Sequence, residues 1–161
     1  MLDALIYPLS FSLNTIGRKW ISCSGGVIRD KDRSVDCRGF LQINWGDSAA
    51  HIGYGFGFMY QNSFSVWGDT GILSGDRVFS RPPDMTGEIR ITRQGRNEAV
   101  AVESADHFEL MMNGFADKVA GGDSSGIDEG ADVLGRLAII SRMRQAFVKN
   151  KKRTVQFAFR P

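Results

Sequence analysis

The segment HIGYGFGF, residues His51–Phe58, is the stretch that decides how this fold is built. Side chains alternate between the two faces of a strand, so each face can be read directly from the sequence. One face is predicted to be a wall of large apolar side chains: Ile52, Tyr54, Phe56 and Phe58. The other face is predicted to be nearly bare backbone: His51, Gly53, Gly55 and Gly57. Glycine weakens a strand interior, so such a row indicates that a helix, a ligand or a second subunit approaches this backbone closely.

The sequence around this segment repeats the same alternation between turn signals. The block Gly39–Phe79 is typical of four or five antiparallel strands joined by tight turns. Over the whole chain the pattern predicts strands at Trp20–Arg29, Cys37–Trp45, Ala49–Met59, Ser63–Trp67, Gly87–Arg93, Glu98–Val102 and Thr154–Phe159, with a short one at Ile72–Leu73.

Three segments have helical rather than strand periodicity. The first covers residues 3–16, where Gly17 is a natural stop and Pro8 predicts an irregular first turn. The second carries apolar residues from Phe108 to Val119, with a cap expected near Ser104 or Asp106. The third covers residues 127–147.

This order of elements predicts an α+β fold in a single domain, residues 1–161. We expect a largely antiparallel, open-faced sheet of about six strands with helices packed on one face. A helix layer covers only one face of such a sheet, and the open face would carry Phe40 together with either the aromatic or the glycine side of residues 51–58. An uncovered apolar face of that size predicts that something else covers it.

Composition and charge are those of an ordinary globular domain and do not favour a nucleic-acid-binding protein. Charged residues make up 24% of the chain and hydrophobic residues 42%, with a net charge of +2, which is ordinary for a globular domain. The one basic run, Lys149–Arg153, is interpreted as a solvated turn, with a nucleic-acid patch as the less favoured reading. We therefore expect no nucleic-acid partner.

Targeting and metal signals are also weak. The sequence shows no signal peptide and no run approaching the ~18 apolar residues of a membrane span, so we expect a cytoplasmic protein without a membrane partner. Its two cysteines, Cys23 and Cys37, are expected to be reduced. With only two histidines and no CxxC or HxxxH spacing, no metal site is expected.

Several motifs, in order, resemble the C-terminal domain of the glucose-fructose oxidoreductase / inositol dehydrogenase / MocA family, and most closely its nucleotide-sugar 3-ketoreductase type. Asp3-Ala-Leu-Ile-Tyr7 looks like the family's D-x-G-x-[HY] helix start, with Leu5 in place of its glycine. Residues 55–84, GFGFMYQNSFSVWGDTGILSGDRVFSRPPD, look like its strand block, and residues 108–122, FELMMNGFADKVAGG, like its late helix. The resemblance covers nearly the whole chain.

The family's cofactor machinery has no counterpart in this sequence. Its members begin with a Rossmann domain whose glycine-rich loop seats the pyrophosphate on a helix N-terminus, and no GxGxxG follows a strand here. The catalytic lysine of the family's E-K-P motif is missing too. The resemblance therefore implies no cofactor in this chain alone, and NAD(P) only if a separate Rossmann-domain protein is a partner.

Carried over residue by residue, the resemblance implies a small set of site residues. Asp3 and Tyr7 would be remnants of the catalytic site, although Asp3 as a helix cap and Tyr7 packed at the sheet edge is the favoured reading. Tyr60, Gln61 and Asn62 lie near where the family's substrate sits, with turn chemistry as the alternative. Tyr7, Tyr60 and Asn62 are the candidate substrate-binding residues.

Other polar residues have mainly structural interpretations. His51 is expected to be exposed or at an interface, and His107 to lie near a helix start. The acidic group Asp123, Asp128 and Glu129 complements a helix dipole better than it suggests a metal or catalytic site. Ser124-Ser125 has no identifiable histidine partner, so a hydrolase triad is unsupported.

The function expected from these observations is a stand-alone module without catalysis, serving dimerisation or the binding of a carbohydrate or nucleotide sugar. The resemblance implies a homodimer through the open sheet face. The alternative is the substrate half of a split NAD(P)-dependent sugar oxidoreductase, completed by a Rossmann partner. A binder of nucleotide sugars without any chemistry is a third, weaker reading.

Overall fold

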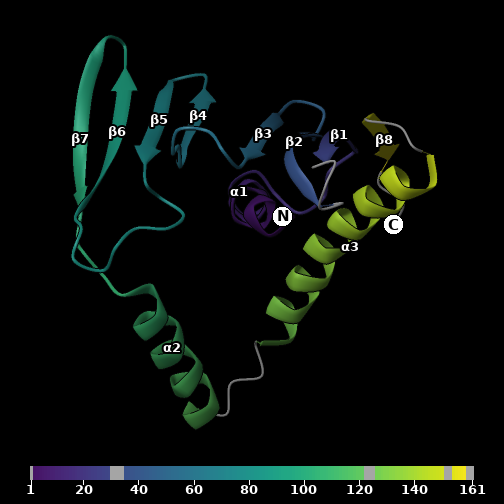
Figure 1. Ribbon diagram of the computed structural model, residues 1–161. Coiled ribbons are helices and arrows are strands. Elements are labelled where there is room, and N and C mark those ends of the chain that lie inside the picture. The colour runs from purple at the N-terminus through teal and green to yellow at the C-terminus, as the bar shows by residue number, and fades with distance from the viewer. Residues whose placement is uncertain (1, 30–34, 122–125, 151–153, 159–161) are drawn as a thin grey trace. The chain divides into compact units, whose positions relative to one another are not determined.

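The computed structural model (Figure 1) describes residues 2–29, 35–121, 126–150 and 154–158. The elements in chain order are α1 (Leu2–Thr15), β1 (Ser22–Arg29), β2 (Asp36–Asn44), β3 (Ala49–Gly55), β4 (Ser63–Gly68), β5 (Gly71–Asp76), β6 (Gly87–Arg93), β7 (Arg96–Val102), α2 (His107–Gly121), α3 (Gly126–Asn150) and β8 (Thr154–Ala158). They form two compact units. Unit 1 comprises residues 1–58 and 127–161, and unit 2 comprises residues 59–126.

Unit 1 contains an antiparallel sheet of four strands in the order β3-β2-β1-β8. Strand alternation decides which face of this sheet becomes the core. On the core face Leu41 of β2 lies between Gly25 of β1 and Ile52 of β3, and Ile43 lies between Cys23 and Ala50. The side chains buried with them come from both helices of the unit: Leu5, Leu9 and Leu13 of α1, and Ile139 and Met143 of α3.

Helix α1 ends where glycine permits it. The backbone N–H of Gly17 donates to the Leu13 carbonyl at 3.1 Å, and Gly17 has φ of 138°, which favours glycine. The Trp45 indole N–H, at the end of β2, then donates to the Gly17 carbonyl at 2.8 Å. This bond ties the end of α1 to the sheet. Pro8 lies inside the helix, which is assigned without a break from Leu2 to Thr15.

Among the glycines of this sheet, a helix side chain lies closest at Gly25 rather than in the glycine row of β3. A Cβ added at Gly25 would lie 2.8 Å from Cε of Met143 and 2.7 Å from the Phe40 carbonyl oxygen. At Gly39 the Tyr54 hydroxyl occupies the same kind of space, 2.5 Å from such a Cβ. These two glycines let α3 and an aromatic ring lie directly on the backbone.

The predicted aromatic wall is half right. Ile52 is buried and Tyr54 is packed against the core, but Phe56 and Phe58 are more than half exposed. The prediction failed because β3 ends at Gly55 instead of continuing to Met59, and Gly57 has φ of 79°, so the alternation stops.

The loop after β3 instead covers its last glycine. The Phe58 ring folds back over Gly55, where an added Cβ would lie 2.7 Å from Cε2. The Arg38 guanidinium lies over this ring, 4.5 Å from its centroid. At Gly53 an added Cβ meets nothing within 4 Å among the described residues.

The open face of the unit 1 sheet is mainly polar. Phe40 and Ile28 are its large apolar side chains that remain about half exposed. Phe40 pairs with Gly26 on one side and Gly53 on the other, so its ring has no side chain directly across from it on β1 or β3. His51 is exposed, as the sequence predicted.

Unit 2 contains a second antiparallel sheet of four strands in the order β4-β5-β6-β7. The register puts Phe64, Gly75, Ile89 and Val100 on one face, and Ser65, Ser74, Arg90 and Ala99 on the other. On the apolar face, a Cβ added at Gly75 would lie in tight contact with the side chains of Phe64, Val78 and Ile89. Gln94 and Gly95, both with positive φ, turn β6 into β7.

Helix α2 begins at the predicted cap. The Asp106 carboxylate accepts hydrogen bonds from the backbone N–H groups of Phe108 at 2.8 Å and Glu109 at 3.2 Å. No α2 residue is buried in the described structure. Its exposed apolar residues are Phe108, Leu110, Met111, Met112, Phe115 and Val119.

The α+β class and the antiparallel pairing predicted from the sequence are confirmed. In detail, the strands form two sheets of four, where one sheet of about six was expected. Helices cover one face of the unit 1 sheet, through the core formed with α1 and α3. The single-domain assignment stays a prediction.

Replacing Gly25 with alanine should destabilise the protein by about 1–3 kcal/mol, because the added methyl would overlap the Phe40 carbonyl, which cannot move independently. Gly53→Ala is the matched control in the next strand but one. Its methyl enters open space, so its free energy of unfolding should change by less than about 0.5 kcal/mol. Urea unfolding followed by circular dichroism measures both, and equal stability of the two variants would contradict the close approach at Gly25.

Candidate functional site

The best-defined polar cluster lies in unit 2, where β4 begins. The Asn62 Nδ2 donates to the Tyr60 hydroxyl oxygen at 3.1 Å and to the Ser80 Oγ at 3.0 Å. The Tyr60 and Ser80 hydroxyls are themselves 3.2 Å apart. Two candidate substrate-binding residues from the sequence, Tyr60 and Asn62, are thus brought together, and Ser80 completes the cluster.

The orientation of the Asn62 amide is fixed by the backbone. The Phe79 N–H donates to Asn62 Oδ1 at 3.0 Å, so the Nδ2 group must face the two hydroxyls. The Asn62 carbonyl in turn accepts from the Arg77 N–H at 2.5 Å. A single residue therefore holds both the start of β4 and the chain after β5.

Arg77 is the fourth member of the cluster and has an unusual backbone conformation. Its φ of 51° lies in the left-handed region, which costs an ordinary residue about 1–3 kcal/mol. Its guanidinium carbon lies 5.2 Å from the centroid of the Tyr60 ring, a cation–π distance. The strained backbone thus places a cation over an exposed aromatic ring.

These neighbours favour ionisation of the Tyr60 phenol. Its pKa is lowered from the ordinary value of 10.0, first by the hydrogen bond with Ser80, and also by Asn62 and by the positive charge of Arg77. The small loss of hydration at the site opposes this shift. Because 59% of Tyr60 is exposed, its hydroxyl is open to a ligand or to water.

Tyr7 lies on α1 in unit 1 and is 53% exposed, whereas Leu5 and Leu9 of the same helix are fully buried. The sequence predicted that Tyr7 packs at the sheet edge, whereas about half of its side chain is exposed to solvent. Asp3 lies in the first turn of α1, and its side chain lies outside the described residues. The roles of Asp3 and Tyr7 stay predictions.

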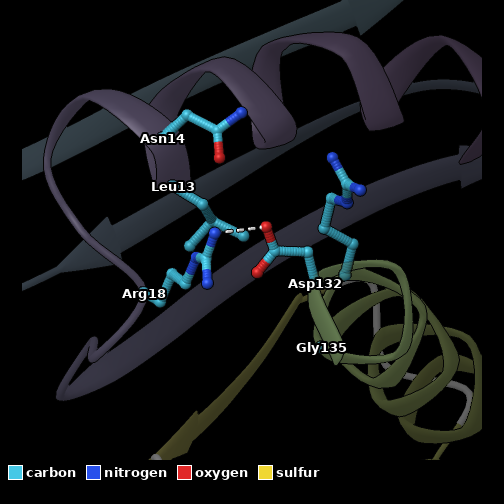
Figure 2. A pocket seen from close by; sticks show the side chains of 6 residues that line it. Leu13, Asn14, Arg18, Asp132 and Gly135 are labelled. Carbon is cyan, nitrogen blue, oxygen red and sulfur yellow. Dashed lines mark ion pairs between the residues drawn. The ribbon is translucent and has the colours of Figure 1, made fainter. Parts of the chain in front are cut away.

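Unit 1 has a small cavity of about 170 Å³ between α1 and α3. Figure 2 shows Arg18 and Asp132 pointing toward each other across it, and their ion pair measures 2.5 Å. Arg136 Nη1 donates to the Ser10 hydroxyl at 3.0 Å. Because these polar groups bind one another and link the two helices, we interpret the cavity as part of the helix packing.

The remaining candidates have structural surroundings. His107 is the first residue of α2 and is exposed. Burial raises the pKa of the Cys23 thiol to about 12, so it stays neutral in the core. Burial and the nearby Asp36 carboxylate also raise the pKa of Tyr54 to about 12.

Other candidates fall outside the described residues. Asp123 and Ser124-Ser125 lie there entirely, as do Lys151–Arg153 of the basic run, and so do the side chains of Asp128 and Glu129. Within the described part of the chain, no group of three or more acidic, histidine or cysteine residues could hold a metal ion. No helix in that part is long and apolar enough to cross a membrane.

Ser80 and Arg77 are the members of the cluster that the sequence did not identify. They lie 15 to 20 positions from Tyr60 and Asn62, across the β4–β5 hairpin. Pairing of β4 with β5, in which Ser63 lies opposite Asp76, brings them together. That register could have been used as a signal, because it places the residues following Asp76 beside those preceding Ser63.

No family model matches the sequence. Among curated proteins, the dTDP-3,4-didehydro-2,6-dideoxy-alpha-D-glucose 3-reductase of Saccharopolyspora spinosa is 27% identical over 154 residues, covering 91% of this chain and 46% of that protein. The enzyme of the same name from Streptomyces violaceoruber is 28% identical over 158 residues, covering 91% and 45%. The chain therefore spans about half the length of the curated relatives it matches.

Solved structures agree on the fold. A mutant 3-ketoreductase from Actinomadura kijaniata, in complex with TDP-benzene and NADP, matches with a TM-score of 0.82 at 23% identity over 89% of this chain and 46% of that one. A putative oxidoreductase from Bacillus subtilis matches with a TM-score of 0.63 at 13% identity, over 96% of this chain and 50% of that one. The chain is similar to part of the dTDP-sugar 3-ketoreductases and shares an oxidoreductase-like α+β fold. The wider family resemblance stays a prediction.

Proposed function

We propose that this chain is an oxidoreductase C-terminal-like module that binds a nucleotide sugar and pairs with a second copy of itself, without carrying out a reaction alone. The observation that carries this proposal is the cluster of Tyr60, Asn62, Ser80 and Arg77. Its two sequence-predicted members lie in a chain that aligns over 91% of its length with a dTDP-sugar reductase. The chain spans about half the length of that relative, and binding and assembly are the roles that we propose for this half.

The chemistry of the cluster suits such a ligand. The exposed Tyr60 ring offers an apolar surface, and its hydroxyl offers a hydrogen-bonding group at the edge. Arg77 supplies a guanidinium, which matches a phosphate oxygen in charge and geometry. A nucleotide sugar carries both kinds of group, a polyhydroxylated ring and a diphosphate.

The open face of the unit 1 sheet is the surface we assign to pairing. Helices α1 and α3 pack on the opposite face through the buried core. Phe40, 48% exposed, projects from the open face between two glycines, and Ile28 on β1 is 56% exposed. A twofold contact uses the same patch on both subunits, so Phe40 of each copy would lie at the contact.

A second candidate is the substrate half of a split NAD(P)-dependent sugar oxidoreductase. The exposed side chain of Tyr7, on a helix whose next turns are buried, favours it, because it leaves a hydroxyl free for a partner's active site. NAD(P) when bound would supply hydride chemistry. In this candidate the partner's Rossmann domain holds the cofactor.

Binding of dTDP-glucose should raise the melting temperature of the protein, because a ligand of the folded state stabilises it by mass action. Replacing Arg77 with alanine should weaken the dissociation constant by roughly 10- to 100-fold, the value of a charge-assisted hydrogen bond. Arg96→Ala is the control, because it removes an exposed arginine from the same unit at the start of β7. Equal affinity of the two variants, or no shift with dTDP-glucose, contradicts the binding proposal.

The protein should form a homodimer in solution at micromolar concentration. Light scattering after gel filtration should give about twice the chain mass of 17.8 kDa, and Phe40→Asp should reduce it to the monomer value, because a carboxylate would be buried unpaired at the contact. Trp67→Asp, at an 81% exposed aromatic of unit 2, is the control and should leave the dimer intact. A monomeric wild-type protein would refute pairing.

The split-enzyme candidate predicts that NADPH fluorescence changes when this chain is mixed with a separately produced Rossmann-domain partner, and that Tyr7→Phe lowers the turnover of the pair. Copurification from the native source would supply such a partner. If a copurified partner binds NADPH but its affinity and turnover do not respond to this chain, the candidate fails.

A further inference from the structure

Helix α2 carries an apolar stripe that the described residues leave uncovered. Four apolar residues lie in one line along the helix, because they follow one another at spacings of four, three and four residues: Phe108, Met112, Phe115 and Val119. Met111 lies beside them on the same side of the helix. These residues form the α2 stripe, and each of them is 59–76% exposed.

The neighbouring sheet of unit 2 offers little apolar surface to this stripe. Its apolar face is partly covered already, because Phe64 and Ile89 are half-buried and Val78 packs beside them over Gly75. Among the described residues of that face, Val100 is the large apolar one that stays open, at 43% exposed. A second chain is therefore a better fit to the stripe than the sheet next to it.

The spacing of the stripe is the same in both directions along the helix. A twofold axis at right angles to the helix, between residues 113 and 114, exchanges position 108 with 119 and position 112 with 115. Two antiparallel copies of α2 would thus pack Phe108 against Val119 and Met112 against Phe115, which are the layers of an antiparallel coiled coil. A contact between two copies of one surface requires this kind of self-complementarity.

The charges at the helix ends favour the antiparallel arrangement over the parallel one. Glu109 lies in the first turn of α2 and Lys118 in the last turn. In an antiparallel pair, each end holds Glu109 of one copy and Lys118 of the other, and the helix dipoles also oppose each other. A parallel pair would gather both glutamates at one end. The stripe itself contains no charged residue, so pairing buries no carboxylate or ammonium group within it.

The stripe is large enough for a weak but specific contact. At these exposures it presents about 600 Å² of surface per helix, because an aromatic side chain alone can bury roughly 150–250 Å². Two copies would bury about 1,200 Å² in total, which is the lower limit of specific protein interfaces. We therefore expect pairing that strengthens visibly with protein concentration.

We propose that α2 is a pairing helix, which binds α2 of a second copy of this chain in an antiparallel arrangement. The contact uses residues of unit 2 alone, whereas the sheet-face pairing proposed above uses unit 1. The inference does not rest on the proposed function. If the sheet faces pair, α2 joins two dimers, and if they do not, α2 joins two single chains.

The test is sedimentation equilibrium of the intact chain from about 1 to 300 μM, over which the mass of the wild-type assembly should double. Phe115→Asp should abolish the doubling, because its carboxylate would be buried against Met112 of the other copy. Leu110→Asp is the matched control, because Leu110 is 60% exposed on the other side of the same helix, and it should leave the doubling unchanged. No doubling in wild type, or equal loss in both variants, overturns the proposal.

A second variant guards against an effect on the helix itself. Met112→Lys introduces a good helix former, so circular dichroism should show unchanged helix content and urea unfolding an unchanged midpoint. It should nevertheless lose the doubling, because an ammonium group would be buried at the contact. A Met112→Lys protein that pairs as wild type does would refute the stripe as the contact.

The direction of pairing is tested with a mixture of Met112→Cys and Phe115→Cys chains. Under mild oxidation, mass spectrometry should find a disulfide between position 112 of one chain and position 115 of the other, because these positions face each other in the antiparallel pair. Disulfides that join position 112 to position 112 instead would indicate a parallel pair and overturn the arrangement.

Phe40→Asp separates this contact from the sheet-face pairing. That variant should still double its mass over the same range, from one chain to two. If Phe40→Asp removes all association, the sheet face carries it, and the inference fails while the sheet-face pairing stands. A wild-type protein that is monomeric at micromolar concentration and doubles only through α2 refutes the sheet-face pairing and supports the inference. If wild type does not double, but a copurified partner binds it and not Phe115→Asp, the stripe belongs to that partner and the inference is overturned.

Discussion

The contact between Met143 and the backbone of Gly25 is the constraint on which unit 1 depends. β1 is an inner strand, paired with β2 on one side and β8 on the other, so the helix that lies on it covers the middle of the sheet. Glycine at this position lets Met143 approach the backbone, and Leu41 and Ile43 of β2 can then pack beside it with the α1 leucines. A larger residue would overlap the Phe40 carbonyl and the end of the Met143 side chain, so the packing at this point would have to shift.

The sequence predicted these elements correctly wherever local propensity and the burial pattern indicated the same structure. Alternation in β1, β2 and β6 and the Asp106 cap of α2 were read correctly, because local propensity and burial favour the same answer there. The end of β3 was predicted wrongly. Phe56 and Phe58 continue the alternating sequence pattern, but the positive φ of Gly57 ends the strand geometry. Periodicity alone does not register a change of backbone direction at a glycine.

The candidate site was predictable only in part for a similar reason. Tyr60 and Asn62 are close in sequence and were identified through a resemblance of motifs. Ser80 and Arg77 join them only after β4 pairs with β5. The positive φ of Arg77 could not be predicted from its residue type. The hairpin register could have placed these residues beside Tyr60 and Asn62, but the backbone dihedral angle of Arg77 is not contained in a single sequence.

The division of the chain has a consequence for the order in which the protein is made. Unit 2 is one continuous segment, residues 59–126, whereas unit 1 is built from residues 1–58 together with 127–161. During synthesis the hairpins of unit 2 have all their partners at once, but β1 waits for Met143 of α3 and for β8 to emerge. Until then the apolar face of β1 and β2 has only α1 against it. A ribosome that stalls before Met143 emerges would therefore leave this face exposed to a chaperone that binds apolar strands.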